Sequence, residues 1–187
     1  MKLQIPCVIL CGGKSSRMGT PKQNLDFGGI PLSHFQAARL QNIFKSVYFS
    51  SKIPLLNPYN IKTILDKSSD FSPLFGLQSA LESLESDIFV ISVDSPFFDK
   101  ESIFKIFNAF SKKAVFAKNT KIHPLLGIYP LESLKDIKQN ILNKEYKLMR
   151  LLEAIGAESV EIPLEFTQNL NTQEDYLRAL RILKNKG

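Results

Sequence analysis

The chain has 187 residues, of which 44% are apolar and 22% charged, a composition that suits one globular domain with a substantial core over residues 1–187. No apolar run approaches the roughly 18 residues that span a bilayer, and the first residues do not resemble a signal peptide, so we expect a cytoplasmic protein. The net charge of +6 favours anionic partners, but no basic run is interleaved with aromatic residues as in proteins that bind single-stranded nucleic acid.

The first predicted element is a buried strand over Cys7–Leu10, four apolar residues that end just before the glycine pair Gly12 and Gly13. The residues that follow include a further glycine, Arg17 and Lys22, and almost no apolar side chain. Glycine leaves backbone N–H groups open to phosphate oxygens, while guanidinium and ammonium groups attract those oxygens. This loop is therefore predicted to bind a nucleotide triphosphate.

Two well-known phosphate loops do not match these residues. The P-loop needs glycine where Val8 stands, and the dinucleotide pattern G-x-G-x-x-G fails because Gly12 and Gly13 are adjacent and the next glycine is Gly19. The residues do match L-x-G-G-x-x-x-R-M-G-x-x-K, which resembles the signature loop of nucleotidyltransferases. These enzymes move a nucleoside monophosphate onto a phosphate acceptor. A plain surface loop of small and charged residues is the alternative interpretation.

Strand and helix signals alternate through the rest of the chain. Pro31 is predicted to open a helix and Asp99 to cap another, and Thr172 and Asp175 are predicted to form a capping box before the last one. His34 on the first helix is interpreted as structural or solvated rather than catalytic. The predicted strands are Cys7–Leu10, Val47–Phe49, Ile61–Leu65, Ile88–Ile91, Ala114–Ala117, Leu125–Tyr129 and Val160–Ile162.

This alternation predicts an α/β, Rossmann-like three-layer fold with a mostly parallel central sheet and helices on both faces. Ligands of such sheets bind beyond the carboxyl ends of the strands. We therefore expect Leu10 to Gly13, Ser50, Asp66 and Asp94, which come at the ends of the first four strands, to rim one crevice. Asp94, followed by Ser-Pro, is well placed to hold Mg²⁺ against phosphates, and a turn residue is the alternative interpretation for both Asp94 and Asp66.

These motifs resemble those of the molybdenum cofactor guanylyltransferases, the MobA family. Leu10 to Gly19 is similar to the family loop L-A-G-G-x-x-x-R-M-G, although Cys11 stands where the family usually has Ala. Ser50 replaces an Asn that often contacts the nucleotide, and a hydroxyl lacks the paired donor and acceptor of an amide. The other matches are Lys22, Asp66 at the family's V-x-x-D, Ser72–Gly76 at its G-P-L-x-G, Asp94–Pro96 at its D-x-P, the pair His123-Pro124, and Asn169–Thr172 at its N-x-N-T.

The resemblance implies that GMP is transferred from GTP to molybdopterin by in-line displacement at the α-phosphorus, with release of pyrophosphate and no nucleophilic side chain. Arg17 and the loop amides would hold the leaving phosphates, Lys22 would neutralise the α-phosphate, and Asp94 would hold Mg²⁺. The implied nucleotide-binding set is Leu10, Cys11, Gly12, Gly13, Lys22, Ser50, Asp66 and Asp94.

Two alternatives stay open from the sequence. One is a related nucleotidyltransferase that acts on a sugar phosphate or an isoprenoid precursor, and the short chain, which leaves no room for an extra acceptor domain, disfavours the sugar enzymes. The other is a non-catalytic nucleotide-binding regulator, which would need the loop but not the metal site at Asp94. We expect a monomer whose partners are GTP, molybdopterin and molybdoenzyme-maturation proteins, and which binds neither nucleic acid nor membranes.

Overall fold

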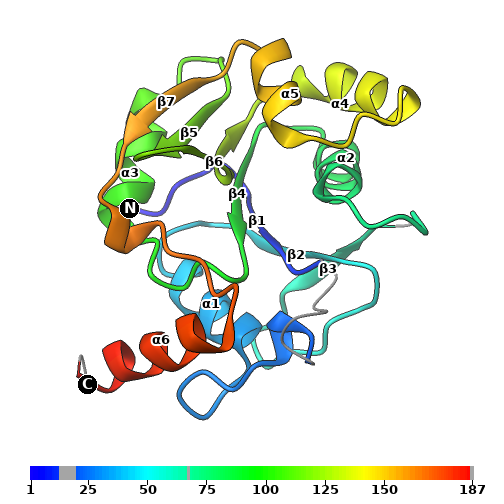
Figure 1. Ribbon diagram of the computed structural model, residues 1–187. Helices are drawn as coiled ribbons and strands as arrows, with labels where there is room; N and C mark the ends of the chain where they lie inside the picture. Colours follow the sequence, from blue (N-terminus) through cyan, green and yellow to red (C-terminus); the bar gives the residue numbers. More distant parts are fainter. Residues whose placement is uncertain (13–19, 67, 186–187) are drawn as a thin grey trace.

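A computed structural model describes residues 1–12, 20–66 and 68–185 (Figure 1). Within these ranges the strands form one sheet in the order β3-β2-β1-β4-β6-β5-β7. The strands are β1 Cys7–Leu10, β2 Val47–Ser51, β3 Lys62–Leu65, β4 Ile88–Ser92, β5 Val115–Lys118, β6 Ile122–Tyr129 and β7 Glu158–Glu161. The helices are α1 Leu32–Leu40, α2 Pro73–Leu84, α3 Lys100–Ala109, α4 Ser133–Leu142, α5 Leu148–Ala154 and α6 Gln173–Asn185, with short 3-10 turns η1 Lys22–Asn24 and η2 Leu164–Phe166.

Helices cover both faces of the sheet, which confirms the predicted three-layer α/β fold (Figure 1). Strand β1 lies inside the sheet and is buried on both faces, which explains its continuous apolar run. Cys7 and Ile9 pack into the apolar layer that contains residues of α1, α3 and α6, whereas Val8 and Leu10 pack into the layer that contains residues of α2, α4 and α5. A strand buried on both faces has no polar side to show, so its sequence does not alternate.

The predicted mostly parallel sheet is confirmed, with one exception in its middle. Strand β6 runs antiparallel to both β4 and β5, while the other neighbouring pairs are parallel. The reason is the short turn between β5 and β6, in which the Asn119 backbone N–H donates to the Lys121 carbonyl at 3.1 Å. A turn of this length has no room for the crossover helix that a parallel neighbour requires. Strand β6 therefore begins at Ile122, three residues before the predicted Leu125.

The predicted helix caps are present. Asp99 accepts a hydrogen bond from the Ser102 N–H at 2.9 Å at the start of α3. Thr172 and Asp175 bond reciprocally before α6, since each side chain accepts from the backbone N–H of the other, at 3.1 and 2.9 Å. His34 also has a structural environment, as its Nε2 lies 3.1 Å from the Leu56 carbonyl oxygen. Among the described residues, no helix has both the length and the apolar composition to cross a bilayer.

Gly127 on β6 lies where two strands approach too closely for any side chain. A Cβ added there would lie 2.2 Å from the Val115 carbonyl oxygen and 2.7 Å from the Phe116 Cα, beside the register shift between Phe116 and Ala117. We expect Gly127→Ala to lower the free energy of unfolding by about 3 kcal/mol, because backbone atoms must move to admit the methyl group. Urea denaturation would measure this.

Gly12→Ala is the matched control, since a Cβ at Gly12 would meet nothing within 4 Å among the described residues. Its unfolding midpoint should stay close to that of the wild type. An unchanged midpoint for Gly127→Ala would show that β5 and β6 can separate at little cost.

Candidate nucleotide-binding site

The carboxyl ends of the first four strands lie level with one another. Leu10 is in register with Ser50 on β2 and with Ser92 on β4. Backbone hydrogen bonds continue this alignment beyond the strands, because the Cys11 N–H donates to the Ser50 carbonyl at 2.9 Å and the Asp66 N–H donates to the Ser51 carbonyl at 2.9 Å. Residues from distant parts of the sequence are thereby brought to one edge of the sheet.

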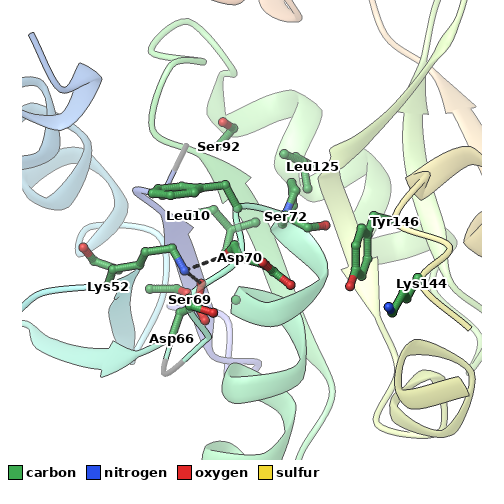
Figure 2. Close-up of a pocket in the computed structure, with 16 residues that line it drawn as sticks. Leu10, Lys52, Asp66, Ser69, Asp70, Ser72, Ser92, Leu125, Lys144 and Tyr146 are labelled. Atoms are coloured by element: carbon green, nitrogen blue, oxygen red, sulfur yellow. Dashed lines mark hydrogen bonds and ion pairs between the residues drawn. The ribbon is translucent and has the colours of Figure 1, made fainter. Parts of the chain in front are cut away.

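A pocket of about 890 Å³ lies at this edge (Figure 2). Its lining includes four of the residues predicted to bind nucleotide, namely Leu10, Gly12, Ser50 and Asp66. In Figure 2, Lys52 and Asp66 lie on one side of the pocket, and Lys144 and Tyr146 lie on the other. Gly13 and Arg17, the other predicted residues of the first loop, lie outside the described residues.

The start of helix α2 forms part of the pocket lining and packs closely against β2. Ser72 caps this helix by accepting from the Leu74 N–H at 3.3 Å, and Pro73 occupies its first turn. Gly76, in the first turn of α2, lies very near β2. A Cβ added at Gly76 would be 2.9 Å from the Ser50 Oγ. Ser50 is only 2% exposed as a result. Its hydroxyl is small enough to fit beneath α2.

Cys11 can contribute only its backbone to a ligand. Its side chain is 4% exposed and packs in the apolar core, where the thiol donates to the Ile9 carbonyl at 3.6 Å. Burial raises the pKa of the Cys11 thiol, which stays protonated at neutral pH. The replacement of Ala by Cys at this position of the motif therefore adds no reactive group to the pocket.

Two of the three predicted catalytic residues meet beside the pocket. The Lys22 Nζ, at the start of η1, lies 2.5 Å from the Asp94 Oδ2. The other oxygen of Asp94 accepts a hydrogen bond from the Ser92 hydroxyl at 2.6 Å. Ser92 also lines the pocket, so it links the Asp94 carboxylate to the cavity. Lys22 further donates to the Asn171 Oδ1 at 3.0 Å, from the segment just before α6.

The turn that carries Asp94 is held from behind by α1. The Gln36 side-chain amide is fully buried and donates to the carbonyl oxygens of Ser92 and Val93, at 3.3 and 3.1 Å. Arg39 donates to the Gln36 Oε1 at 2.6 Å and to the Phe98 carbonyl at 2.7 Å. Buried backbone carbonyls that are satisfied in this way cannot shift without losing several hydrogen bonds together. These buried hydrogen bonds from Gln36 and Arg39 thus fix the position of the turn that carries Asp94.

The chain before α6 holds the same turn from the other side. The Leu170 N–H donates to the Asp94 carbonyl at 2.8 Å, and the Ser95 hydroxyl donates to the Asn169 Oδ1 at 2.9 Å. Asn169 and Asn171 are the two amides of the N-x-N-T motif noted in the sequence. One of these amides supports the turn, and the other contacts Lys22.

His123, the histidine of the His-Pro pair, contacts the turn between β5 and β6. His123 lies on β6, is 9% exposed, and has its Nε2 3.2 Å from the Asn119 Oδ1 in the β5–β6 turn. Burial, followed by the nearby charge of Lys121, lowers the pKa of His123. The imidazole is therefore neutral at pH 7 and adds no charge to the site.

A divalent cation could be held at this site through one protein carboxylate. Within the described ranges there is no cluster of three or more His, Cys, Asp or Glu placed to ligate a metal ion. Asp94 nevertheless fits a Mg²⁺ ion, which commonly takes one or two carboxylates and completes its shell with water and substrate phosphates. Because Lys22 contacts the Asp94 Oδ2, its ammonium would have to yield that oxygen.

The comparison with protein families agrees with this geometry. The model of the MobA-like NTP transferase domain matches residues 7–160. The chain belongs to this family. The resemblance predicted from the loop, from Asp66 and from Asp94 is thus confirmed, and the protein is a nucleotidyltransferase.

Curated relatives of this MobA-like chain match it over almost its whole length. A probable molybdenum cofactor guanylyltransferase of Aquifex aeolicus is 32% identical, covering 94% of this chain and 90% of the relative. A molybdenum cofactor guanylyltransferase of Campylobacter jejuni subsp. doylei is 37% identical, covering 92% and 94%. The crystal structure of molybdopterin-guanine dinucleotide biosynthesis protein A from Archaeoglobus fulgidus has the same fold, with a TM-score of 0.82, 20% identity, and coverage of 97% and 100%.

Several site residues were not found by the sequence analysis. The N-x-N-T pattern does not indicate a role for its two amides, although Asn171 contacts Lys22 and Asn169 contacts Ser95. The role of Gln36 could have been predicted, since a glutamine among the apolar positions of a helix is often buried to satisfy a backbone hydrogen bond. Nothing in the sequence indicates the role of Lys52, because a single lysine after a strand resembles any solvated surface lysine.

Proposed function

We propose that this protein, acting as a single nucleotidyltransferase domain over residues 1–187, transfers GMP from GTP to molybdopterin and releases pyrophosphate. Membership of the MobA-like family and the names of the curated relatives support this proposal. The observation that carries it is the pairing of Lys22 with Asp94 beside a pocket at the carboxyl ends of β1–β4. A cation and an anion so placed can neutralise a triphosphate and hold its metal ion.

In this reaction an oxygen of the terminal phosphate of molybdopterin forms a bond to the α-phosphorus, and the bond from that phosphorus to the bridging oxygen of the β-phosphate breaks. The electron pair leaves with pyrophosphate. Lys22 donates to a non-bridging oxygen of the α-phosphate, where negative charge rearranges, and Arg17 holds the leaving phosphates. Asp94 would hold Mg²⁺, and the bound ion would supply charge neutralisation at the phosphate oxygens. Positioning and charge supply most of the catalysis in such transfers.

The pocket then holds the nucleoside. We place the base against the backbone at the end of β1, where Leu10 and Gly12 line the pocket and Cys11 lies between them, and Gly13 belongs to the same predicted loop. Gly12 lines this pocket, and a residue without a side chain lets its backbone approach a ligand closely. Asp66 accepts hydrogen bonds from the ribose hydroxyls at the end of β3, and Ser50 lines the floor between these two groups.

Nucleotide choice is the first test of the proposal. We expect GTP to be used far better than ATP, CTP or UTP, with molybdopterin as acceptor and Mg²⁺ required. Fixed backbone donors and acceptors reject a base with the wrong edge, because each buried polar group left without a partner costs about 1–3 kcal/mol. Pyrophosphate release from each nucleotide, measured with Mg²⁺ and a panel of phosphorylated acceptors, reports the preference directly.

The other outcomes of that experiment separate the alternatives. Equal or better turnover with CTP or UTP would refute guanylyl transfer and point to an enzyme for an isoprenoid precursor or a sugar phosphate. Nucleotide binding that depends on Mg²⁺, with no transfer to any acceptor, would indicate a regulator.

A further inference from the structure

Lys52, just beyond the end of β2, is bound on three sides by the segment that follows β3. Its Nζ donates to the Asp66 Oδ2 at 3.1 Å, to the Ser68 carbonyl at 2.6 Å and to the Asp70 carbonyl at 2.7 Å. An ammonium group has three hydrogens, so these acceptors use them all. The Nζ also lies 5.0 Å from the centre of the Phe71 ring, within range of a cation–π contact.

This arrangement forms one wall of the pocket. Lys52, Asp66, Asp70 and Phe71 all line the cavity, and Figure 2 shows Lys52 extending toward Asp66 and Asp70 across its edge. The side chains of Lys52 and Asp66 are 24% and 10% exposed, so their ion pair is largely shielded from water. Such a pair is worth more than one on the open surface.

Both oxygens of the Asp66 carboxylate are oriented by these contacts. Its Oδ1 accepts from the Ser68 N–H at 2.9 Å, while its Oδ2 accepts from Lys52. Each carboxylate oxygen can accept two hydrogen bonds, so both keep capacity for a further donor. Ribose presents two neighbouring hydroxyl groups, which are donors of the kind that a fixed carboxylate recognises.

We propose that Lys52 is a positioning residue for nucleotide binding, which holds Asp66 and residues 68–71 in the arrangement that receives the ribose hydroxyls. The inference rests on the proposed function of this pocket. Lys52 does not itself contact the nucleotide, because a new acceptor would require it to release one of its three protein partners. Its effect reaches the substrate through the Asp66 carboxylate.

The test compares Lys52→Met, which keeps the apolar stem and removes the charge, with Lys62→Met on β3, where the lysine is exposed. We expect Lys52→Met to raise the KM for GTP about tenfold, as the loss of a charge-assisted hydrogen bond predicts, and to leave kcat within about twofold. Lys62→Met should match the wild type in both. Circular dichroism and urea midpoints would establish that each variant is folded.

A second readout distinguishes positioning from general stabilisation. The wild type should prefer GTP over an analogue that lacks both ribose hydroxyls, and Lys52→Met and Asp66→Asn should each reduce that preference. The preference for GTP over this analogue should fall no further in the double variant than in the more severe single variant, because the two residues act through the same contact. Lys52→Arg, which keeps a cation, should recover part of the preference.

Three results would overturn the inference. One is an unchanged KM and an unchanged ribose preference in folded Lys52→Met, even if its urea midpoint falls. Another is a fall in kcat alone, and the third is additive losses in the double variant. If the wild type binds GTP but transfers nothing, the proposed function fails, and the same variants are then compared by calorimetric titration with GTP, where the same losses in affinity would still support the role of Lys52. If the wild type does not bind GTP, both proposals fail.

Discussion

Asp94→Asn is expected to remove nearly all turnover and to leave the fold intact. The asparagine keeps the size of the side chain and an oxygen that can accept from the Ser92 hydroxyl, and the backbone carbonyl still receives the Leu170 N–H. What is lost is the negative charge that pairs with Lys22 and would hold Mg²⁺. A loss of about 3–4 kcal/mol of transition-state stabilisation lowers kcat by roughly 10²–10³-fold.

The measurement is pyrophosphate release at saturating GTP, molybdopterin and Mg²⁺, together with a urea midpoint. Glu101→Gln on α3, an exposed position away from the pocket, is the matched loss of one negative charge and should retain wild-type activity. Near-normal turnover by a folded Asp94→Asn protein would remove Asp94 from the catalytic site.

Lys22→Ala is expected to lower kcat more than it raises KM. In the absence of substrate the Lys22 ammonium contacts the Asp94 Oδ2 and the Asn171 Oδ1, two groups that keep it beside the pocket. If its charge meets the α-phosphate as bonds change there, its interaction strengthens in the transition state and the loss falls on kcat. Removing a charge-assisted hydrogen bond in this setting should lower kcat by about 10²-fold.

Steady-state kinetics with GTP as the varied substrate would separate the two parameters. Lys135→Ala, an exposed lysine on α4, controls for the loss of one positive charge from a protein of net charge +6. A rise in KM with an unchanged kcat would make Lys22 a residue that binds the ground state, and would place the catalytic charge elsewhere.

The parts of the molecule that could be predicted are those governed by local rules. The apolar run Cys7–Leu10 specifies a buried strand, and the rule for the carboxyl ends of parallel strands then brings Leu10, Ser50 and Asp66 to one pocket. Asp94 also follows from this rule, because it comes two residues after the end of β4. The direction of β6 did not follow, since it depends on how few residues separate it from β5.

The interactions that escaped prediction depend on the three-dimensional path of the chain and not on residue spacing. Asn171 meets Lys22 across 149 positions, and no periodicity or spacing indicates such a pair. Lys52 is only 14 positions from Asp66, but its role depends on the path of the chain after β3, which places two backbone carbonyls around one ammonium group. Side-chain chemistry can be read from a sequence more readily than the course of a loop.

The separation between Lys22 and Asn171 bears on when the enzyme becomes competent during synthesis. A growing chain presents β1, the first loop and Asp94 early, whereas the segment at Asn169–Asn171 is synthesised after all seven described strands. At about 5–20 residues per second, the 149 positions between Lys22 and Asn171 correspond to roughly 7–30 seconds of synthesis. Nascent chains should therefore contain the residues that line the pocket before the amide that contacts Lys22, and on the proposed roles of these residues the capacity to bind would precede the capacity to transfer.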